Sequence, residues 1–319
     1  MSFITADKLM HHAKFEEKPI TADIFLTNFC NNQCPYCTYG RWELEANEKR
    51  KFITYEEFVK YAERLLSLGV KGIILTGGGE PTINPDFEKI CEWLEKKGID
   101  YGVNTNLNVL KYIKPNYLKV SLDAYDDESY KAYRGVAHYS LVRANIIAYD
   151  KWRKENDVKT NLGIQMVASN VETVNKFYAA NRDLPVDYIS IRPMESTCGS
   201  YYKKELAEDF KPSVLVSAIK TLSGIDERVQ LNYKWDMLNY GVSKCYAAWT
   251  TLAINMFGEV MFCCHKPYEI VGHILDDDIL EKKEKFKTDM AKCDIPCRLS
   301  APNKTIEALE NPSPHVNFI

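Results

Sequence analysis

The sequence lacks three features that would assign it to a common class of protein. No run of 18 apolar residues occurs, and residues 1–20 hold no apolar segment of the kind found in signal peptides. Basic residues are not in excess either, because 41 Lys and Arg stand against 44 Asp and Glu, for a net charge of −3. We therefore expect no membrane span, no secretion and no nucleic-acid partner, and a cytoplasmic location.

Cysteine, by contrast, is abundant, with ten residues among 319. Without a secretion signal, this number indicates a reducing compartment and metal ligation more than disulfide bonds. The chain is long enough for one large α/β domain and a small appendage, and no repeat or low-complexity tract interrupts it.

The first cysteine group has the spacing C-x3-C-x2-C, formed by Cys30, Cys34 and Cys37, and it follows the short apolar run Ile24–Leu26. Three thiolates this close together hold three irons of a 4Fe–4S cluster, and the fourth iron stays open for a substrate or cofactor. Zinc is the alternative. However, structural zinc favours four closed protein ligands, and no fourth ligand lies nearby in the sequence.

Short β-branched runs alternate with helical patterns as far as about residue 225. Apolar faces followed by glycine predict helices at Thr54–Leu68 and Asp86–Lys97, the first with a capping box of Thr54 and Glu57. Six βα units predict a parallel sheet with its active site at the carboxyl ends of the strands. The predicted strands are Asp23–Thr27, Gly72–Thr76, Tyr101–Thr105, Lys119–Leu122, Leu162–Val167 and Tyr188–Arg192.

The cysteine loop after the first strand resembles that of the radical S-adenosylmethionine (SAM) superfamily, and the likeness runs from about Ile20 to the C-terminus. The resemblance implies an α/β fold with a partial (β/α)6 TIM-like barrel over residues 1–230. It also implies that the open iron binds SAM and that SAM cleavage yields a 5′-deoxyadenosyl radical. A one-electron reductant such as flavodoxin or ferredoxin would supply the electron.

A glycine-rich segment, Thr76-Gly-Gly-Gly-Glu-Pro81, follows the second strand. Glycines let the backbone approach a ligand closely, although such a run also occurs in tight turns. The segment resembles the family element that binds the amino group of SAM. By that resemblance, the SAM-binding residues here are Gly78, Gly79 and Glu80.

Polar residues at the ends of the later strands are the other expected cofactor contacts. Asn104 lies in an element like the family's Thr-Asn-Gly, in which Leu107 replaces the glycine. Ser121 and Asp123 resemble a Ser-Leu-Asp element near SAM, with helix capping by Asp123 as the alternative. Arg134 would pair with a carboxylate of SAM or substrate, or form a surface ion pair. From their positions on the fifth and sixth predicted strands alone, we also expect Gln165 and Arg192 to point into the active site.

The alternation of predicted strands and helices stops at about residue 230, and five cysteines follow. One 4Fe–4S cluster needs four thiolates, so one of the five is spare. Their spacing resembles the twitch-type (SPASM-like) auxiliary-cluster domain of radical SAM enzymes, which we expect over residues 231–319. Four thiolates also suit zinc, which is the alternative. The assigned cluster ligands are Cys245, Cys263, Cys293 and Cys297.

The spare cysteine, Cys264, directly follows a ligand in a predicted hairpin strand, where neighbouring side chains face opposite sides. It resembles the cysteine of radical SAM epimerases that returns a hydrogen atom to the substrate radical. The alternatives are a small buried hydrophobic residue, or a swap in which Cys264 and not Cys263 is the ligand. Cys198, after the sixth strand, is the second candidate donor.

The resemblance therefore implies an epimerase that contains two 4Fe–4S clusters and SAM and acts on a carbohydrate or sugar nucleotide. The alternatives are a twitch-type dehydrogenase that oxidises an alcohol carbon, and an epimerase of a ribosomal peptide. The short stretch before Cys30 leads us to expect no separate peptide-recognition domain. A zinc- or cluster-bearing interaction protein without SAM chemistry is the third hypothesis.

Overall fold

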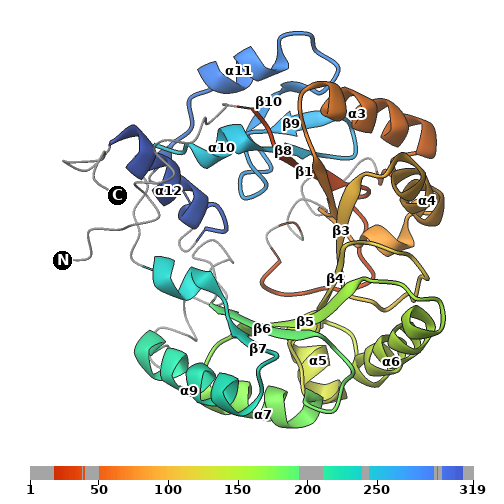
Figure 1. The fold of residues 1–319 in the computed structure, drawn as a ribbon, viewed down its shortest axis with the longest axis vertical. Helices are drawn as coiled ribbons and strands as arrows, with labels where there is room; N and C mark the ends of the chain where they lie inside the picture. Colours follow the sequence, from red (N-terminus) through yellow and green to blue (C-terminus); the bar gives the residue numbers. More distant parts are fainter. Residues whose placement is uncertain are drawn as a thin grey trace.

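The computed structural model describes residues 18–37, 39, 50–193, 211–238, 244–290, 293 and 297–311. These residues form one ten-stranded sheet in the order β10-β9-β8-β1-β2-β3-β4-β5-β6-β7. Strands β1 to β7 are parallel, and β8 pairs in parallel with the other edge of β1. The strands follow an open arc with helices on its outer side (Figure 1). The prediction of an α/β fold with a partial barrel is confirmed.

All six predicted strands are present, each within two residues of its predicted bounds. The three-residue β7 was not predicted, because a run this short leaves no periodic pattern. The strands are Thr21–Phe25 (β1), Gly72–Thr76 (β2), Asp100–Thr105 (β3), Tyr117–Ser121 (β4), Asn161–Ala168 (β5), Tyr188–Pro193 (β6), Val229–Leu231 (β7), Thr251–Ile254 (β8), Glu259–Met261 (β9) and Ile270–His273 (β10).

The two predicted helices are confirmed with their end signals. The Thr54 hydroxyl accepts from Glu57 N (3.2 Å), and the Glu57 carboxylate accepts from Thr54 N (2.9 Å). Gly98 ends the second helix with a φ of +66°. The helices are Tyr55–Ser67 (α3), Phe87–Lys97 (α4), Asp127–Arg134 (α5), Tyr139–Glu155 (α6), Val171–Asn181 (α7), Pro212–Ile225 (α9), Ala247–Thr250 (α10), Ile279–Lys285 (α11) and Ser300–Glu310 (α12), with 3-10 turns at Pro81–Ile83 (η1) and Tyr233–Met237 (η2).

The central strand β1 separates an outer from an inner layer. Ala22 and Ile24 belong to the main core together with apolar residues of the outer helices, such as Phe58 of α3. Because side chains alternate along a strand, Asp23 and Phe25 point to the other, inner face. Asp23 is 1% exposed, so a carboxylate is buried inside the arc.

The C-terminal residues extend the same sheet, since β9 pairs antiparallel with β8 and with β10. Helix α12 contacts η2 and α10 and lies on the side where the arc is open (Figure 1). The division into residues 1–230 and 231–319 stays a prediction. No helix in the described ranges is long and apolar enough to span a bilayer.

Candidate functional site

Three predicted cysteine ligands lie on one loop that leaves the carboxyl end of β1. Cys30, Cys34 and Cys37 are partly buried, and none forms a disulfide bond. The N–H of Cys37 donates to the carbonyl of Cys34 (3.1 Å), which closes a tight turn between these two thiols. The loop therefore brings three free thiols to the edge of the sheet where parallel strands place active sites.

The glycine-rich segment after β2 packs against this cysteine loop. Glu80 N donates to the carbonyl of Phe29, the residue before Cys30, at 2.6 Å. A Cβ atom on Gly79 would lie 1.8 Å from the same carbonyl oxygen, so only glycine fits there. Gly78 is buried beside it. The glycine backbone, which was expected to approach a ligand closely, thus approaches the protein's own cysteine loop.

The Glu80 carboxylate is buried and fully engaged by protein donors. It accepts from Thr82 N (3.1 Å), the Thr82 hydroxyl (2.6 Å), the Thr105 hydroxyl (2.5 Å) and Asn106 N (2.7 Å). Burial raises the pKa of Glu80, and these four hydrogen bonds oppose that shift. Glu80 therefore ties the glycine-rich segment to the end of β3.

Asp123 and Arg134 form a buried ion pair beneath the cysteine loop. The Asp123 carboxylate also accepts from the Tyr36 hydroxyl (2.6 Å) and from Val167 N (2.7 Å). Arg134 Nη1 in turn donates to Cys34 Sγ (3.5 Å). Burial alone would lower the pKa of Arg134, but Asp123 and the other anionic neighbours raise it well above its usual value. Arg134 is thus neither on the surface nor free, and it contacts both Asp123 and the thiol of Cys34.

Helix α5 has Asp126 as its N-cap, because the Asp126 carboxylate accepts from Ser129 N (2.7 Å). Asp123 therefore does not cap this helix, and its backbone has a φ of +55°. Leu107, which replaces the family's glycine, has the same positive φ of 55°. Leu107 thus adopts the left-handed backbone conformation that glycine adopts most easily.

The remaining predicted cofactor contacts lie near the carboxyl ends of β3 to β6. Ser121 and Gln165 are direct register partners of β4 and β5, and Arg192 of β6 is paired with Val167. Asn104 Nδ2 donates to the Thr76 hydroxyl (3.3 Å), but Asn104 Oδ1 is buried without a hydrogen-bond partner among the described residues. A buried acceptor without a donor is costly, so Asn104 is suited to an additional donor from a ligand.

The cysteine loop offers a donor set that fits an iron–sulfur cluster. Cys30 Sγ accepts from Asn32 N (3.4 Å) and Asn106 Nδ2 (3.9 Å), and such N–H bonds stabilise anionic sulfur. Burial raises the pKa of Cys30 to about 12, so metal binding must displace its proton. Within the described residues, no three His, Cys, Asp or Glu side chains could hold a metal ion together. A four-iron cluster has a separate iron for each thiolate, so it does not need three sulfurs on one ion.

The four predicted ligands of the auxiliary cluster also come together, around a cavity in the C-terminal part of the chain. Cys263 is buried and packs with Phe262 and Leu299, and Cys297 Sγ accepts from Leu299 N (3.3 Å). Burial raises the pKa of Cys297, but a hydrogen bond from His265 leaves it below its usual value. The cysteines that line this cavity are Cys245, Cys263, Cys293 and Cys297. Four thiols without disulfide bonds on one cavity are a donor set that fits a second cluster.

Cys263 and Cys264 are neighbours in sequence but belong to different apolar clusters. Cys263 packs with the auxiliary cysteines, and Cys264 packs with a group that includes Phe25 on the inner face of β1. The Tyr39 hydroxyl donates to the carbonyl of Cys264. Strand β9 ends at Met261, so the two cysteines lie in the turn after the predicted hairpin strand and not in it. Even so, their side chains belong to different apolar clusters, and which of the two is a ligand stays a prediction.

Some functional side chains were not predicted. Tyr36 and Tyr39 flank Cys37 and bind Asp123 and Cys264, and their spacing near the cysteines was the only signal. Arg298, which follows Cys297, forms an ion pair with Asp23. The sequence contained one indication of this pair, because an aspartate within a buried strand needs a cationic partner. The second candidate hydrogen donor, Cys198, lies outside the described residues.

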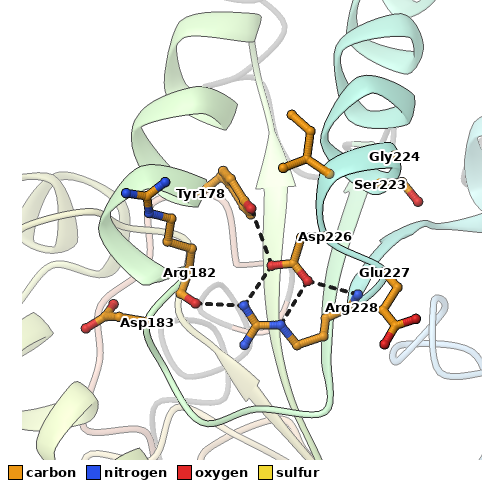
Figure 2. Close-up of a pocket in the computed structure, with 9 residues that line it drawn as sticks. Tyr178, Arg182, Asp183, Ser223, Gly224, Asp226, Glu227 and Arg228 are labelled. Carbon is orange, nitrogen blue, oxygen red and sulfur yellow. Dashed lines mark hydrogen bonds and ion pairs between the residues drawn. The ribbon is translucent and has the colours of Figure 1, made fainter.

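A further cavity contains none of the predicted site residues. It lies between the end of α7 and the segment that leads into β7, at the amino ends of the strands. Arg228 donates to the Asp226 carboxylate through Nε (2.9 Å) and Nη2 (2.7 Å), as Figure 2 shows. The charged groups of Asp226 and Arg228 in this cavity therefore pair with each other.

Comparison with known proteins gives a match at the first cysteine site. Residues 24–178 match the model of the radical SAM superfamily. A GTP 3′,8-cyclase of Haemophilus influenzae is 29% identical over 185 residues, which cover 54% of this chain and 52% of the relative. The mitochondrial GTP 3′,8-cyclase of Arabidopsis thaliana is 30% identical over 184 residues, covering 54% and 46%. The match therefore spans about half the length of these curated relatives.

Solved structures share the fold over most of the chain. Streptococcus suis SuiB bound to S-adenosylmethionine aligns with a TM-score of 0.60 and 17% identity, covering 89% of this chain and 71% of SuiB. The enzyme anSMEcpe with bound AdoMet aligns with a TM-score of 0.58 and 19% identity, covering 84% and 82%. These likenesses concern the fold alone. The family match identifies residues 24–178 as a radical SAM domain.

Proposed function

We propose that this chain is a radical SAM epimerase that inverts a carbon of a carbohydrate or sugar nucleotide. The observation that carries the proposal is the separation of Cys263 from Cys264. One thiol belongs to the auxiliary cysteine set, and its neighbour packs beside the inner face of β1. When bound, SAM and the first cluster supply a 5′-deoxyadenosyl radical that removes a hydrogen atom from the substrate.

In this proposal the first cluster is held by Cys30, Cys34 and Cys37. Glu80 keeps the glycine-rich segment against the cysteine loop, so that Gly78 and Gly79 offer backbone groups to the amino end of SAM. The residues proposed to contact SAM farther along the sheet are Asn104, Ser121, Gln165 and Arg192. The most direct support is the buried Asn104 Oδ1, because it needs a hydrogen-bond donor and none of the described residues provides one.

Asp123 and Arg134 act in a different way from the one expected. Their ion pair and the Arg134 contact with Cys34 hold the cysteine loop in place, so we propose that they position the cluster thiol. Positioning through charged, buried hydrogen bonds is typical of groups that surround metal ligands.

Cys264 would return hydrogen to the opposite face of the substrate carbon. Its S–H bond breaks as the new C–H bond forms, and the thiyl radical left behind takes one electron and one proton. A one-electron reductant of the flavodoxin or ferredoxin class would supply the electron. Cys245, Cys263, Cys293 and Cys297 would hold an auxiliary 4Fe–4S cluster, which would provide one-electron transfer at the site. Cys198 is the second candidate for the donor thiol.

The relatives bear on the substrate class. Two of them are named for a reaction of GTP, which supports a nucleotide-containing small molecule over a ribosomal peptide. Because the match covers about half of those proteins, their cyclisation reaction is not assigned to this chain. A dehydrogenase that oxidises an alcohol carbon is the alternative reaction. It would use the auxiliary cluster as electron acceptor and would need no donor thiol.

An anaerobic turnover in deuterated water tests the proposal. The reconstituted protein is incubated with SAM, reductant and a panel of sugar nucleotides and peptides, and products are read by mass spectrometry. Epimerisation predicts deoxyadenosine and a product one mass unit heavier, because the thiol hydrogen exchanges with solvent. A product two units lighter would instead identify the dehydrogenase.

Two alanine variants identify the donor. Cys264→Ala should still form deoxyadenosine but lose the deuterated, inverted product. Cys198→Ala is the matched control and should keep it. Full inversion by Cys264→Ala would exclude Cys264 as donor, and loss only in the Cys198 variant would assign the role to Cys198.

A further inference from the structure

Lys283 on α11 is a buried cation that the mechanism above does not use. The residue as a whole is 4% exposed, whereas the side chains of Lys282 and Lys285 on the same helix are 42% and 72% exposed. The Lys283 ammonium donates to the carbonyl of Thr251 at the start of β8. It forms no ion pair with any carboxylate in the part of the chain that the structure describes. An ammonium buried without a negative partner is costly, so a counter-charge must be supplied in the working protein.

The position of Thr251 brings Lys283 to the auxiliary cysteines. Ala253 of β8 pairs with Met261 of β9, and Thr251 lies two residues before Ala253 whereas Cys263 lies two residues after Met261. Cys263 in turn packs with Cys245 and Cys297. The groups whose negative charge acts on Lys283 are the thiols Cys263, Cys245 and Cys264 and the Asp23 carboxylate.

The carboxylate in this group is already neutralised. Both Nη atoms of Arg298 bind the Asp23 carboxylate, which leaves the thiols as the other source of negative charge. Neutral thiols would not compensate an ammonium. Burial lowers the pKa of Lys283 to about 8, and negative charge on Cys263, Cys245 and Cys264 opposes that shift. Thiolates bound to a metal centre keep their negative charge at neutral pH.

We propose that Lys283 is the counter-charge of the auxiliary thiolate centre and biases that centre toward accepting an electron. The inference rests on the auxiliary cluster of the proposed function. A cluster becomes more negative when reduced, and a fixed cation in a poorly solvated site stabilises that state. Lys283 is therefore a positioning residue that tunes the potential of the centre, without touching the substrate.

A redox titration of full-length protein tests the inference. Cys30, Cys34 and Cys37 are replaced by alanine so that only the auxiliary cluster is reconstituted, and its reduction is followed by electron paramagnetic resonance. In this background we expect Lys283→Met to lower the ratio of reduced to oxidised cluster at a fixed potential about tenfold, which is about 59 mV for one electron. Lys285→Met is the matched control, since it removes an exposed lysine from the same helix, and Lys283→Arg should keep the original potential.

Each outcome decides a separate point. An unchanged midpoint in Lys283→Met, at full iron content, overturns the role of Lys283 and leaves the proposed function intact. Absence of iron from the triple-alanine background overturns the auxiliary cluster of the proposed function, and this inference with it. If the methionine variant does not fold, Lys283→Gln is measured, because it keeps a donor for Thr251 without the charge. An unchanged potential in that variant also overturns the proposal.

Discussion

The two cysteine centres of this protein are built in opposite ways. The first lies on eight consecutive residues, and buried side chains from the neighbouring strand ends hold that loop in place. The second draws its thiols from separate segments between Cys245 and Cys297 and has a buried lysine beside it. One site is thus fixed by what surrounds a single loop, and the other by the folding together of distant segments. They should fail in different ways when they are disturbed.

The largest expected effect is at the contact between the glycine-rich segment and the cysteine loop. Gly79→Ala would place a Cβ 1.8 Å from the Phe29 carbonyl oxygen, so the loop that carries Cys30 must shift. We expect loss of the first cluster and of SAM cleavage, with the second cluster retained, measured as iron content and deoxyadenosine yield. Gly224→Ala is the control, because its Cβ would meet no atom within 4 Å. Normal SAM cleavage by the Gly79 variant would refute the packing argument.

The next effect concerns the choice between Cys263 and Cys264 as ligand. Two 4Fe–4S clusters hold about eight irons, and Cys263→Ala should reduce this to about four. Cys264→Ala should keep all of them, because its side chain packs with the other apolar cluster. Iron and sulfide analysis after reconstitution measures both. The reverse result would exchange the roles of the two cysteines, and zinc in place of the second four irons would exclude the cluster.

A third prediction concerns the ion pair that holds the first loop. Arg134→Met leaves the Asp123 carboxylate, 4% exposed, without its cation. We expect the free energy of unfolding to fall by about 3–5 kcal/mol, measured by urea denaturation of metal-free protein. Lys176→Met removes an exposed pair with Glu172 and should leave the free energy of unfolding almost unchanged. Equal losses in the two variants would mean that the buried pair adds nothing to loop stability.

The smallest effect is expected away from both centres, at the Asp226–Arg228 pair of Figure 2. The hydrogen bond from Arg228 lowers the pKa of Asp226 below its usual value of 3.8. The stability from this pair is therefore present above about pH 3.8 and is lost as the pH falls through the lower folded-state value. Asp226→Asn should remove that acid-dependent loss, of about 1 kcal/mol or less, from the pH profile of unfolding. A profile identical to the parent's would show that the pair does not stabilise the fold.

The sequence was most informative where the signal is local. The C-x3-C-x2-C spacing, the capping box at Thr54 and the glycine at Gly98 each act within a few residues, and the structure has the expected loop and helix ends. The direct partners of the site were harder to predict. Glu80 was expected to face SAM, yet protein donors engage its carboxylate, because Thr105 and Asn106 come from the next strand. Contacts between residues that are distant in the sequence leave no periodic pattern to detect.

The same limit applied to the C-terminal part. Counting cysteines grouped Cys245, Cys263, Cys293 and Cys297, and the structure gathers them around one cavity. Neither Lys283 nor the pairing of Arg298 with Asp23 could be predicted, because a lysine on a charged helix resembles any exposed lysine. Only the fold determines which of the three lysines on α11 is buried.

The pairing of β8 with β1 has a consequence for synthesis of the chain. Thr21 pairs with Thr251, so one edge of the strand that carries the first cysteine loop cannot pair until late in translation. At roughly 5–20 residues per second, that edge stays open for many seconds after β1 and β2 have emerged. An unpaired edge on a nascent chain is prone to wrong pairing with other chains. We infer that the first cysteine loop becomes fully supported only after residue 254 leaves the ribosome, so premature release would yield a chain that has Cys30, Cys34 and Cys37 but lacks β8 on the edge of β1.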